Sequence, residues 1–434
     1  MRHILYSFLA INAYLFSTQT LAKDCIIDNF FQKSIQFNSY SLDIEELDIN
    51  KHNNIKTMLP DINIGLGQYI NNNQWFSSIT DSHFYLSLSY NLLSAYEAKM
   101  QNNKLDIANY LKYIEMLSER NNYIINLFSE IINYKIKKSH LMLMLERYRK
   151  LNKEYEIAKH KMSIGLISAL DVEMIYNILQ KIRFDIDVLE EEESLLSDKI
   201  SREYHVPESA IPDITYHKLK ECKTADFYTL LAENKKLKIK AADIDNDIRK
   251  LSEIPSFYLS FGLTPKQGGA LGNMSLRKMD YSASLGISFP LMGLFSSSVN
   301  QKEKIISMSR TRNESLKENI KLDLLEKEIR QKIDRLEKNL AMMKNELTLK
   351  KRKVEYINYR LKNGQDDVIT YLSSVENLHE TENEFQKIGY EIEYYSLYHY
   401  FFCSTFPIQG KCDNYYGVLH GSKNVKYKSP FAGL

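Results

Sequence analysis

Residues 281–291 read YSASLGISFPL, and this short stretch decides the fold of the chain. Apolar side chains occupy every second position from Tyr281 to Leu291, and small or polar side chains fill most positions between them. Such a period of two predicts a β-strand with one apolar face.

The spacing of apolar residues changes after Gly293. Between residues 329 and 361 they recur at alternating steps of four and three, which is a coiled-coil register that only Lys350 interrupts. These positions are Ile329, Ile333, Leu336, Leu340, Met343, Leu347, Val354, Ile357 and Leu361. No proline or glycine follows before Gly364, so we expect one helix of roughly 65 residues, about 100 Å long at 1.5 Å per residue. A strand that leads into such a helix does not fit inside a compact globule.

The overall composition agrees with long helices. The 434 residues include only 15 glycines and 8 prolines. The net charge is +2, and opposite charges are mixed along the same predicted helices, which argues against a nucleic-acid-binding surface.

Residues 1–22 read as a cleaved secretory signal peptide. Arg2 and His3 are followed by the apolar stretch 4–16 and by Thr20-Leu21-Ala22, a suitable cleavage site. The alternative is a membrane anchor, but the apolar stretch is too short to span a bilayer. No later stretch has the roughly 18 apolar residues of a transmembrane helix, so contact with a membrane would have to use strands.

The sequence contains two tandem repeats. Residues 35–60 align with 230–255 at an offset of 195, and residues 87–165 align with 286–364 at an offset of 199. The first repeat covers 23–223, with strands at about 61–70 and 82–92, a long helix at 93–163, a return helix at 168–203 and a linker at 204–223. The second repeat covers 224–403, with strands at about 256–264 and 281–291, a long helix at 295–362 and a return helix at 367–403. Residues 404–434 follow as a C-terminal segment and tail.

All four predicted strands alternate apolar residues with small or polar ones, as the strands of outer-membrane barrels do. Four strands are too few to close a barrel, and open sheet edges are not tolerated in lipid. We therefore expect several copies of the chain to share one barrel. The alternative is a soluble sandwich or two exposed hairpins, but no other part of the sequence offers to cover their apolar faces.

The four cysteines, Cys25, Cys222, Cys403 and Cys412, allow two disulfides in an exported chain. Cys403 and Cys412 are nine positions apart at the end of the last predicted helix, which makes a local bridge between them a candidate. The sequence does not determine the connectivity, and unpaired thiols without a role remain the alternative.

Taken together, the pattern resembles the TolC-like outer-membrane efflux and secretion channels over about residues 35–403. The motifs that carry the resemblance are the junctions Leu59-Pro60 and Ile254-Pro255, the stretch Ser288-Phe289-Pro290-Leu291, and the turns at residues 164–172 and 363–372. The resemblance implies an α+β membrane protein that forms a homotrimer. Its 12-stranded outer-membrane β-barrel, with four strands per chain, would continue into a long periplasmic α-helical barrel of coiled-coil helices. Residues 23–34, 204–223 and the C-terminal segment would lie near the equator of this helical barrel.

The resemblance also implies the partners. They are a periplasmic adaptor (a membrane fusion protein), an inner-membrane transporter of the RND, ABC or MFS type, and the lipid of a Gram-negative outer membrane. In the family the two helical turns form the periplasmic tip, which contacts the adaptor and constricts the channel. The matching positions are Gly165, Leu166 and Asp171 in the first turn, and Gly364 and Gln365 in the second, where the glycine alone matches.

The predicted entrance departs from the best-known family pattern. Aspartates expected six and nine residues after the second glycine are Thr370 and Ser373, and an arginine expected two residues after it is Asp366. One hypothesis is that Asp366 and Asp367 make the mouth negative, with six carboxylates in a trimer. The other is that Asp366 only caps the return helix, where an acid favours the helix dipole.

The sequence gives no sign of catalysis, so we expect no enzyme activity, no cofactor and no metal. The ten histidines are scattered, and the chain has neither metal-ligand spacing nor a nucleotide-binding loop. We therefore predict a passive exit channel for a tripartite efflux pump or a type I secretion system. The rival prediction is a secreted or periplasmic coiled-coil scaffold or adaptor without a pore.

Overall fold

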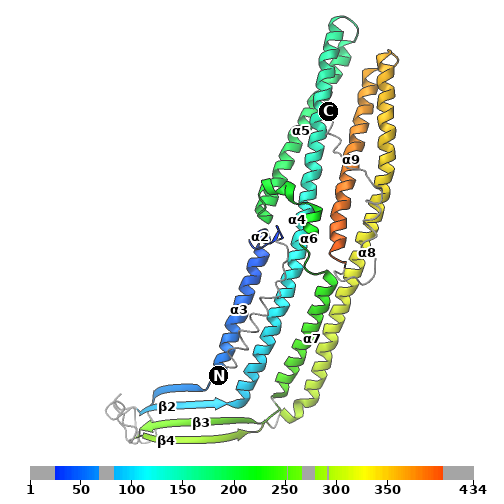
Figure 1. Ribbon diagram of the computed structural model, residues 1–434. Helices are drawn as coiled ribbons and strands as arrows, with labels where there is room; N and C mark the ends of the chain where they lie inside the picture. Colours follow the sequence, from blue (N-terminus) through cyan, green and yellow to red (C-terminus); the bar gives the residue numbers. More distant parts are fainter. Residues whose placement is uncertain (1–24, 68–82, 252, 266–278, 291–292, 404–434) are drawn as a thin grey trace. The chain divides into compact units, whose positions relative to one another are not determined.

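Helices and one small sheet make up the described part of the chain. The computed structural model describes residues 25–67, 83–251, 253–265, 279–290 and 293–403. The predicted signal peptide 1–22 and the tail 404–434 therefore lie outside the described residues. In chain order (Figure 1), the elements are α2 (Asp28–Phe31), α3 (Ile35–Thr57), β1 (Asp61–Gly67), β2 (His83–Asn91), α4 (Leu92–Ser163), α5 (Ala169–Tyr204), η2 (Glu208–Asp213), α6 (Tyr216–Glu221), α7 (Phe227–Leu251), β3 (Ser256–Pro265), β4 (Met279–Ser288), α8 (Gly293–Lys362) and α9 (Val368–Tyr400).

The chain divides into two compact units. Within the described residues, the hairpin unit contains residues 25–38, 117–230 and 320–403, and the sheet unit contains residues 39–116 and 231–319. The helices α4 (72 residues) and α8 (70 residues) each contribute to both units. Both helices run on without a break, as their low glycine and proline content predicts.

The sheet unit contains one antiparallel sheet with the strand order β1-β2-β3-β4. Ile62 pairs with Leu88, Leu88 with Phe261, and Phe261 with Ala283, so one row of apolar residues crosses all four strands. The strand predicted at 281–291 instead covers Met279–Ser288, and its predicted end is wrong. Pro290 has no N–H group to continue the ladder, which ends the strand before it.

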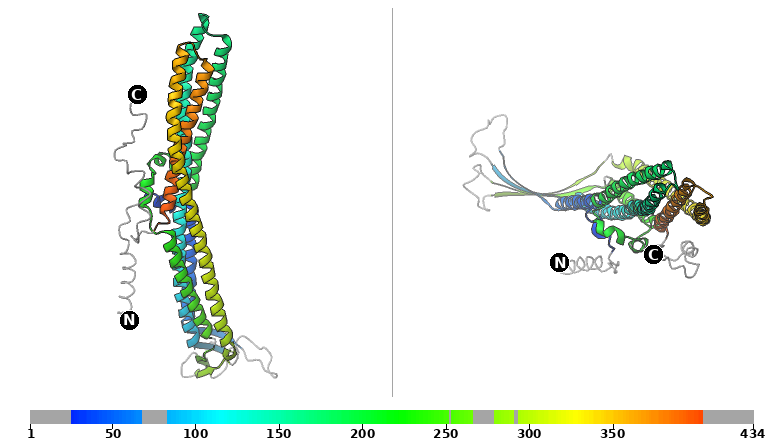
Figure 2. Two further views of the ribbon diagram at one scale, coloured as in Figure 1. Left: turned by 90° about the vertical axis from the view of Figure 1, so that its right-hand side faces the viewer. Right: turned by 90° about the horizontal axis from the view of Figure 1, so that it is seen from above.

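The hairpin unit contains two antiparallel helix pairs, in which α5 folds back along α4 and α9 folds back along α8 (Figures 1 and 2). The α4–α5 pair is held by an apolar seam whose buried residues follow the predicted coiled-coil spacing. They are Leu141, Met144, Leu151 and Ala158 on α4, and Val172, Ile175, Leu179, Ile182, Ile186 and Leu189 on α5.

The α8–α9 pair repeats this arrangement with smaller apolar clusters. Ile329 and Ile333 pack near Phe402, and Leu336 packs with Ile388 and Ile392. At the position where the predicted seam is broken, the Lys350 ammonium donates to the Thr381 hydroxyl at 2.7 Å. The polar residue in the seam therefore has a partner on the facing helix.

The region predicted as a linker, 204–223, contains the two short helices η2 and α6. A disulfide joins Cys25 to Cys222, the C-cap residue of α6, and so ties the start of the described chain to this region. Arg120 of α4 is 5% exposed and reaches both sides of the bridge. It donates to the Asp28 carboxylate at 2.7 Å and to the Cys222 carbonyl at 2.8 Å. The sequence left this connectivity open, and no local spacing points to a pair so far apart.

Candidate functional site

The first helical turn connects α4 to α5 and has a well-defined cap at each side. Gly165 has φ +77°, its N–H donates to the Met162 carbonyl at 3.0 Å, and the Leu166 N–H donates to the Lys161 carbonyl at 2.9 Å. This pair of bonds is the Schellman motif, whose left-handed residue is normally glycine. On the other side, the Ser168 hydroxyl accepts from the Asp171 N–H at 3.1 Å and donates to the Asp171 carboxylate at 2.7 Å. Asp171 is thus part of the helix cap.

Apolar side chains gather on the outside of this turn. Leu166 is 69% exposed, and Ile164 and Leu170 are 58% and 60% exposed. Ile167 of the same turn instead packs against the α4–α5 seam, and Val172 belongs to that seam. Three exposed aliphatic side chains on one turn form a compact apolar surface that nothing in the hairpin unit covers, among the residues that the structure describes.

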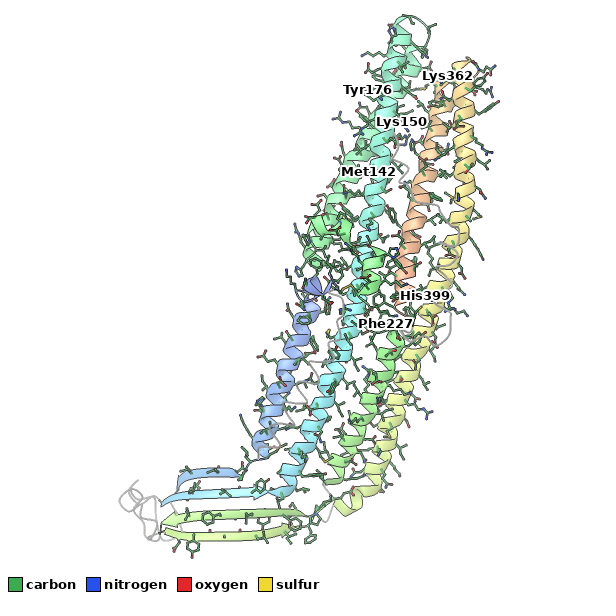
Figure 3. The ribbon with its side chains drawn as sticks, viewed as in Figure 1. Met142, Lys150, Tyr176, Phe227, Lys362 and His399 are labelled. Atoms are coloured by element: carbon green, nitrogen blue, oxygen red, sulfur yellow. A yellow bond between two sulfur atoms is a disulfide. The ribbon has the colours of Figure 1, made fainter. Side chains whose placement is uncertain are left out.

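The second turn, between α8 and α9, has the same backbone arrangement. Gly364 has φ +71°, its N–H donates to the Leu361 carbonyl at 3.1 Å, and the Gln365 N–H donates to the Arg360 carbonyl at 2.9 Å. Lys362, the last residue of α8, lies beside this turn (Figure 3). The two turns are therefore equivalent in conformation although they share only the glycine in sequence.

The paired acids of the second turn have different partners. Asp367 is the N-cap of α9 and accepts from the Thr370 N–H at 2.6 Å. Hydrogen bonds from Thr370 lower the pKa of Asp367 below its usual value, because they stabilise the carboxylate. Asp366 instead lies 3.2 Å from Arg360 in an ion pair. The cap is therefore Asp367, one residue later than the capping hypothesis placed it.

Thr370 and Ser373 are exposed on the first turns of α9. The structure thus brings four of the predicted entrance positions, Asp366, Asp367, Thr370 and Ser373, to one end of α9. Whether they line an entrance remains a prediction.

Polar contacts join the two hairpins, and no pattern in the sequence predicts them. The Tyr371 hydroxyl of α9 donates to the Glu154 carboxylate of α4 at 3.3 Å, and Arg147 of α4 forms a 3.2 Å ion pair with Glu376 of α9. Burial raises the pKa of Glu154 above its usual value. These partners are more than 200 residues apart in the chain, so no periodic pattern could have paired them.

The sheet separates apolar and polar residues onto two faces. Successive side chains of a strand point to opposite faces, and the register aligns like with like. The apolar face carries Ile62, Ile64, Leu86, Leu88, Tyr90, Phe257, Leu259, Phe261, Leu263, Tyr281, Ala283, Leu285 and Ile287, most of them exposed. The opposite face is rich in serine and glycine and also carries Tyr85 and Tyr258. The Ser260 and Ser284 hydroxyls lie 2.6 Å apart on it. The outer edges of β1 and β4 have no strand partner among the described residues.

Long apolar stripes also remain exposed on the helices. In the sheet unit, α8 exposes Val299, Ile306 and Ile320 at multiples of seven residues. In the hairpin unit the same helix exposes Met342, Leu349 and Tyr356, again seven apart. A repeat of seven on one helix face is the pattern of a helix that packs against another helix. Figure 3 shows Met142 and Tyr176, two further exposed large side chains, on α4 and α5.

The remaining questions concern the predicted cysteine bridge and metal binding. Cys403 is disulfide-bonded, but Cys412 lies outside the described residues, so the predicted bridge between them stays a prediction. Throughout the described ranges, no group of three or more histidine, cysteine, aspartate or glutamate side chains is arranged to hold a metal ion.

Within the described residues, every helix lacks a stretch that is both long and apolar enough to traverse a bilayer.

No protein-family profile matches the sequence. No curated protein matches it either. Solved structures do match. The Campylobacter jejuni outer-membrane channel CmeC aligns with a TM-score of 0.66 at 11% identity over 92% of this chain and 89% of CmeC. The Vibrio cholerae outer-membrane protein VceC aligns with a TM-score of 0.65 at 11% identity over 88% of this chain and 96% of VceC. The open state of the Neisseria gonorrhoeae outer-membrane channel MtrE aligns with a TM-score of 0.67 at 10% identity over 87% of each chain. The chain therefore shares the fold of these outer-membrane proteins, as the sequence resemblance predicted.

Proposed function

We propose that this chain is one subunit of a homotrimeric outer-membrane exit channel that serves a tripartite efflux pump. Type I secretion is the second system that such a channel would serve. The channel is a passive conduit, and an inner-membrane partner supplies the energy. The observation that carries the proposal is the fold shared with CmeC, VceC and MtrE over almost their whole length.

The chemistry of the sheet supports a position in lipid. An exposed apolar face opposite a serine-rich face suits a strand wall with hydrocarbon on one side and water on the other. The free edges of β1 and β4 require strand partners in lipid, because unpaired backbone groups are costly there. Three copies would provide twelve strands and close the barrel.

The exposed heptad stripes support the same assembly. An apolar stripe such as Val299, Ile306 and Ile320 needs a partner helix, and a second copy of the chain provides one. In the assembled trimer the helices would enclose the periplasmic part of the conduit. The equivalent turn conformations at Gly165 and Gly364 support the two tandem repeats, each of which has one such turn between its long helix and its return helix.

The two turns are the proposed contact with a periplasmic adaptor. Leu166 and its exposed neighbours offer apolar contact area, and Gly165, Asp171, Gly364 and Gln365 hold the turns in shape. The inner-membrane transporter, of the RND, ABC or MFS type, would act through that adaptor. The carboxylates of Asp366 and Asp367 are the proposed entrance charges.

One experiment tests the assembly directly. Outer membranes of cells that express the chain are extracted with detergent, and the mass of the purified particle is measured by light scattering. The proposal expects a detergent-dependent trimer. A monomer or dimer that is soluble in plain buffer would instead identify the pore-free coiled-coil scaffold.

A second experiment tests the entrance. The reversal potential of single channels is measured under a salt gradient for wild type and for Asp366→Ala combined with Asp367→Ala. The negative-mouth proposal expects a smaller cation preference in the double variant. An unchanged reversal potential would limit these acids to capping α9 and pairing with Arg360.

A further inference from the structure

Two tyrosines of the sheet each lie across a glycine on the neighbouring strand. Tyr85 of β2 pairs with Gly65 of β1, and Tyr258 of β3 pairs with Gly286 of β4. A methyl group built on Gly65 would lie 2.7 Å from Cε1 of Tyr85, and one built on Gly286 would lie 2.5 Å from Cε1 of Tyr258. These distances are too short for real carbon atoms. Each ring therefore fills the space that a side chain would need on the facing strand.

The alternating pattern of the strands fixes their faces but not their register. A slip of two residues between β3 and β4 keeps every apolar residue on the apolar face, because the period of the pattern is two. Residues 266–278 connect the two strands, and this connection is much longer than the roughly two- to five-residue loops that set the register of tight hairpins. Another feature must therefore distinguish the native register from the slipped ones.

Gly286 provides that distinction in β4. On the polar face of this strand its neighbours two residues away are Ser284 and Ser288, so a slip of two in either direction would place a side chain under the Tyr258 ring. The first hairpin is less selective. Gly67 follows Gly65 two positions later in β1, so one direction of slip again offers a glycine to Tyr85.

We propose that Tyr258 and Gly286 act as a unit that sets the register of the β3–β4 hairpin during folding. An aromatic ring that covers a cross-strand glycine replaces the contacts that the glycine lacks, and it does so in one register only. This inference concerns the pairing of two strands within one chain. It holds whether or not the sheet closes into a channel.

The test measures the register by disulfide cross-linking in the refolded full-length chain. Ser256→Cys with Ser288→Cys reports the native register, because these residues are cross-strand partners. Ser260→Cys with Ser282→Cys reports a slip of two residues. The urea-unfolded chain is refolded in detergent and oxidised, and the cross-linked peptides are quantified by mass spectrometry. Loss of the native cross-link reports a slip in either direction.

The variants are Tyr258→Ala, Gly286→Ala and the combination of both. Each single change is expected to raise the ratio of slipped to native cross-link about fivefold, the effect of losing a cross-strand aromatic contact of about 1 kcal/mol. The combination is expected to raise it no further, because either change alone breaks the unit. Gly262→Ala is the matched control. Gly262 lies on the same polar face. A methyl group built on it would lie 2.9 Å from the Ser282 hydroxyl oxygen, and no aromatic ring lies within 4 Å of that methyl group.

Two results would overturn the proposal. The first is an unchanged ratio in every variant. The second is that Tyr258→Ala keeps the native register and also restores it in Gly286→Ala, which would mean that glycine only avoids a collision with the ring. Because the cross-links are read from peptides, this test does not depend on trimer formation or on a pore.

Discussion

Removal of the Cys25–Cys222 disulfide is expected to destabilise the chain by several kcal/mol. The bridge joins residues 197 positions apart. In the loop-entropy description, a closed loop of this length lowers the entropy of the unfolded chain by about 18 cal/mol/K, which corresponds to about 5 kcal/mol at 25 °C. Arg120 holds Asp28 and the Cys222 carbonyl together in the folded state. We therefore expect Cys25→Ser with Cys222→Ser to act mainly through the unfolded state and to keep the native helix content.

The assay is equilibrium urea unfolding followed by far-UV circular dichroism. Cys403→Ser with Cys412→Ser is the comparison variant, since its predicted bridge joins residues only nine positions apart. The same description gives about 2.5 kcal/mol for that loop. Equal losses in the two variants, or a loss below about 1 kcal/mol for the long loop, would refute the reasoning from loop length.

Three further predictions concern single residues of the hairpin unit. Gly364→Ala is expected to lower the free energy of unfolding, measured by thermal unfolding, by about 1–2 kcal/mol, because φ +71° is strained for alanine. The control Gly389→Ala, within α9 where the added methyl group meets no other atom, is expected to raise that free energy by up to about 1 kcal/mol. Asp367→Ala is expected to speed amide hydrogen exchange in the first turn of α9 at pH 7. That difference should vanish as the pH falls through the lowered pKa of Asp367, because its cap stabilises the fold only while it is ionised. Burial lowers the pKa of Lys223 from its usual value of 10.5 to about 8. Between these two pH values Lys223 is therefore neutral in the folded chain and protonated in the unfolded chain. The contribution of Lys223 to stability is therefore expected to rise from pH 8 to 10.5, so the difference between the urea midpoints of wild type and Lys223→Met should shift in favour of wild type over this range.

The sequence predicted the features that depend on local periodicity. The four strands, the two long helices and both return helices were recognisable because each has a run of regularly spaced apolar residues. Their bounds differ by at most three residues, and Pro290 accounts for the early end of β4. The positions of the turns were also recognisable, since Gly165 and Gly364 lie just after the last apolar residue of a long helix.

Features that depend on long-range contact were not recognisable. α6 is only six residues long, too short to show a period, and it is held by a disulfide whose partner lies in another part of the sequence. The acids at the second turn illustrate a different limit. Asp366 and Asp367 are adjacent and chemically identical, and only the backbone geometry decides that one pairs with Arg360 and the other caps α9.

The two kinds of contact in the hairpin unit differ in strength. The α4–α5 seam buries side chains such as Ile175 and Leu179 almost completely, and each contributes about 1.5–3 kcal/mol through burial of apolar area. The contacts between the hairpins include the ion pair of Arg147 with Glu376, whose carboxylate is partly exposed. Partly exposed pairs contribute about 0–1 kcal/mol each. The α4–α5 pair is therefore held more firmly by its seam than it is held to α9 by these polar contacts, and Leu372 of α9 adds apolar contact to the same cluster.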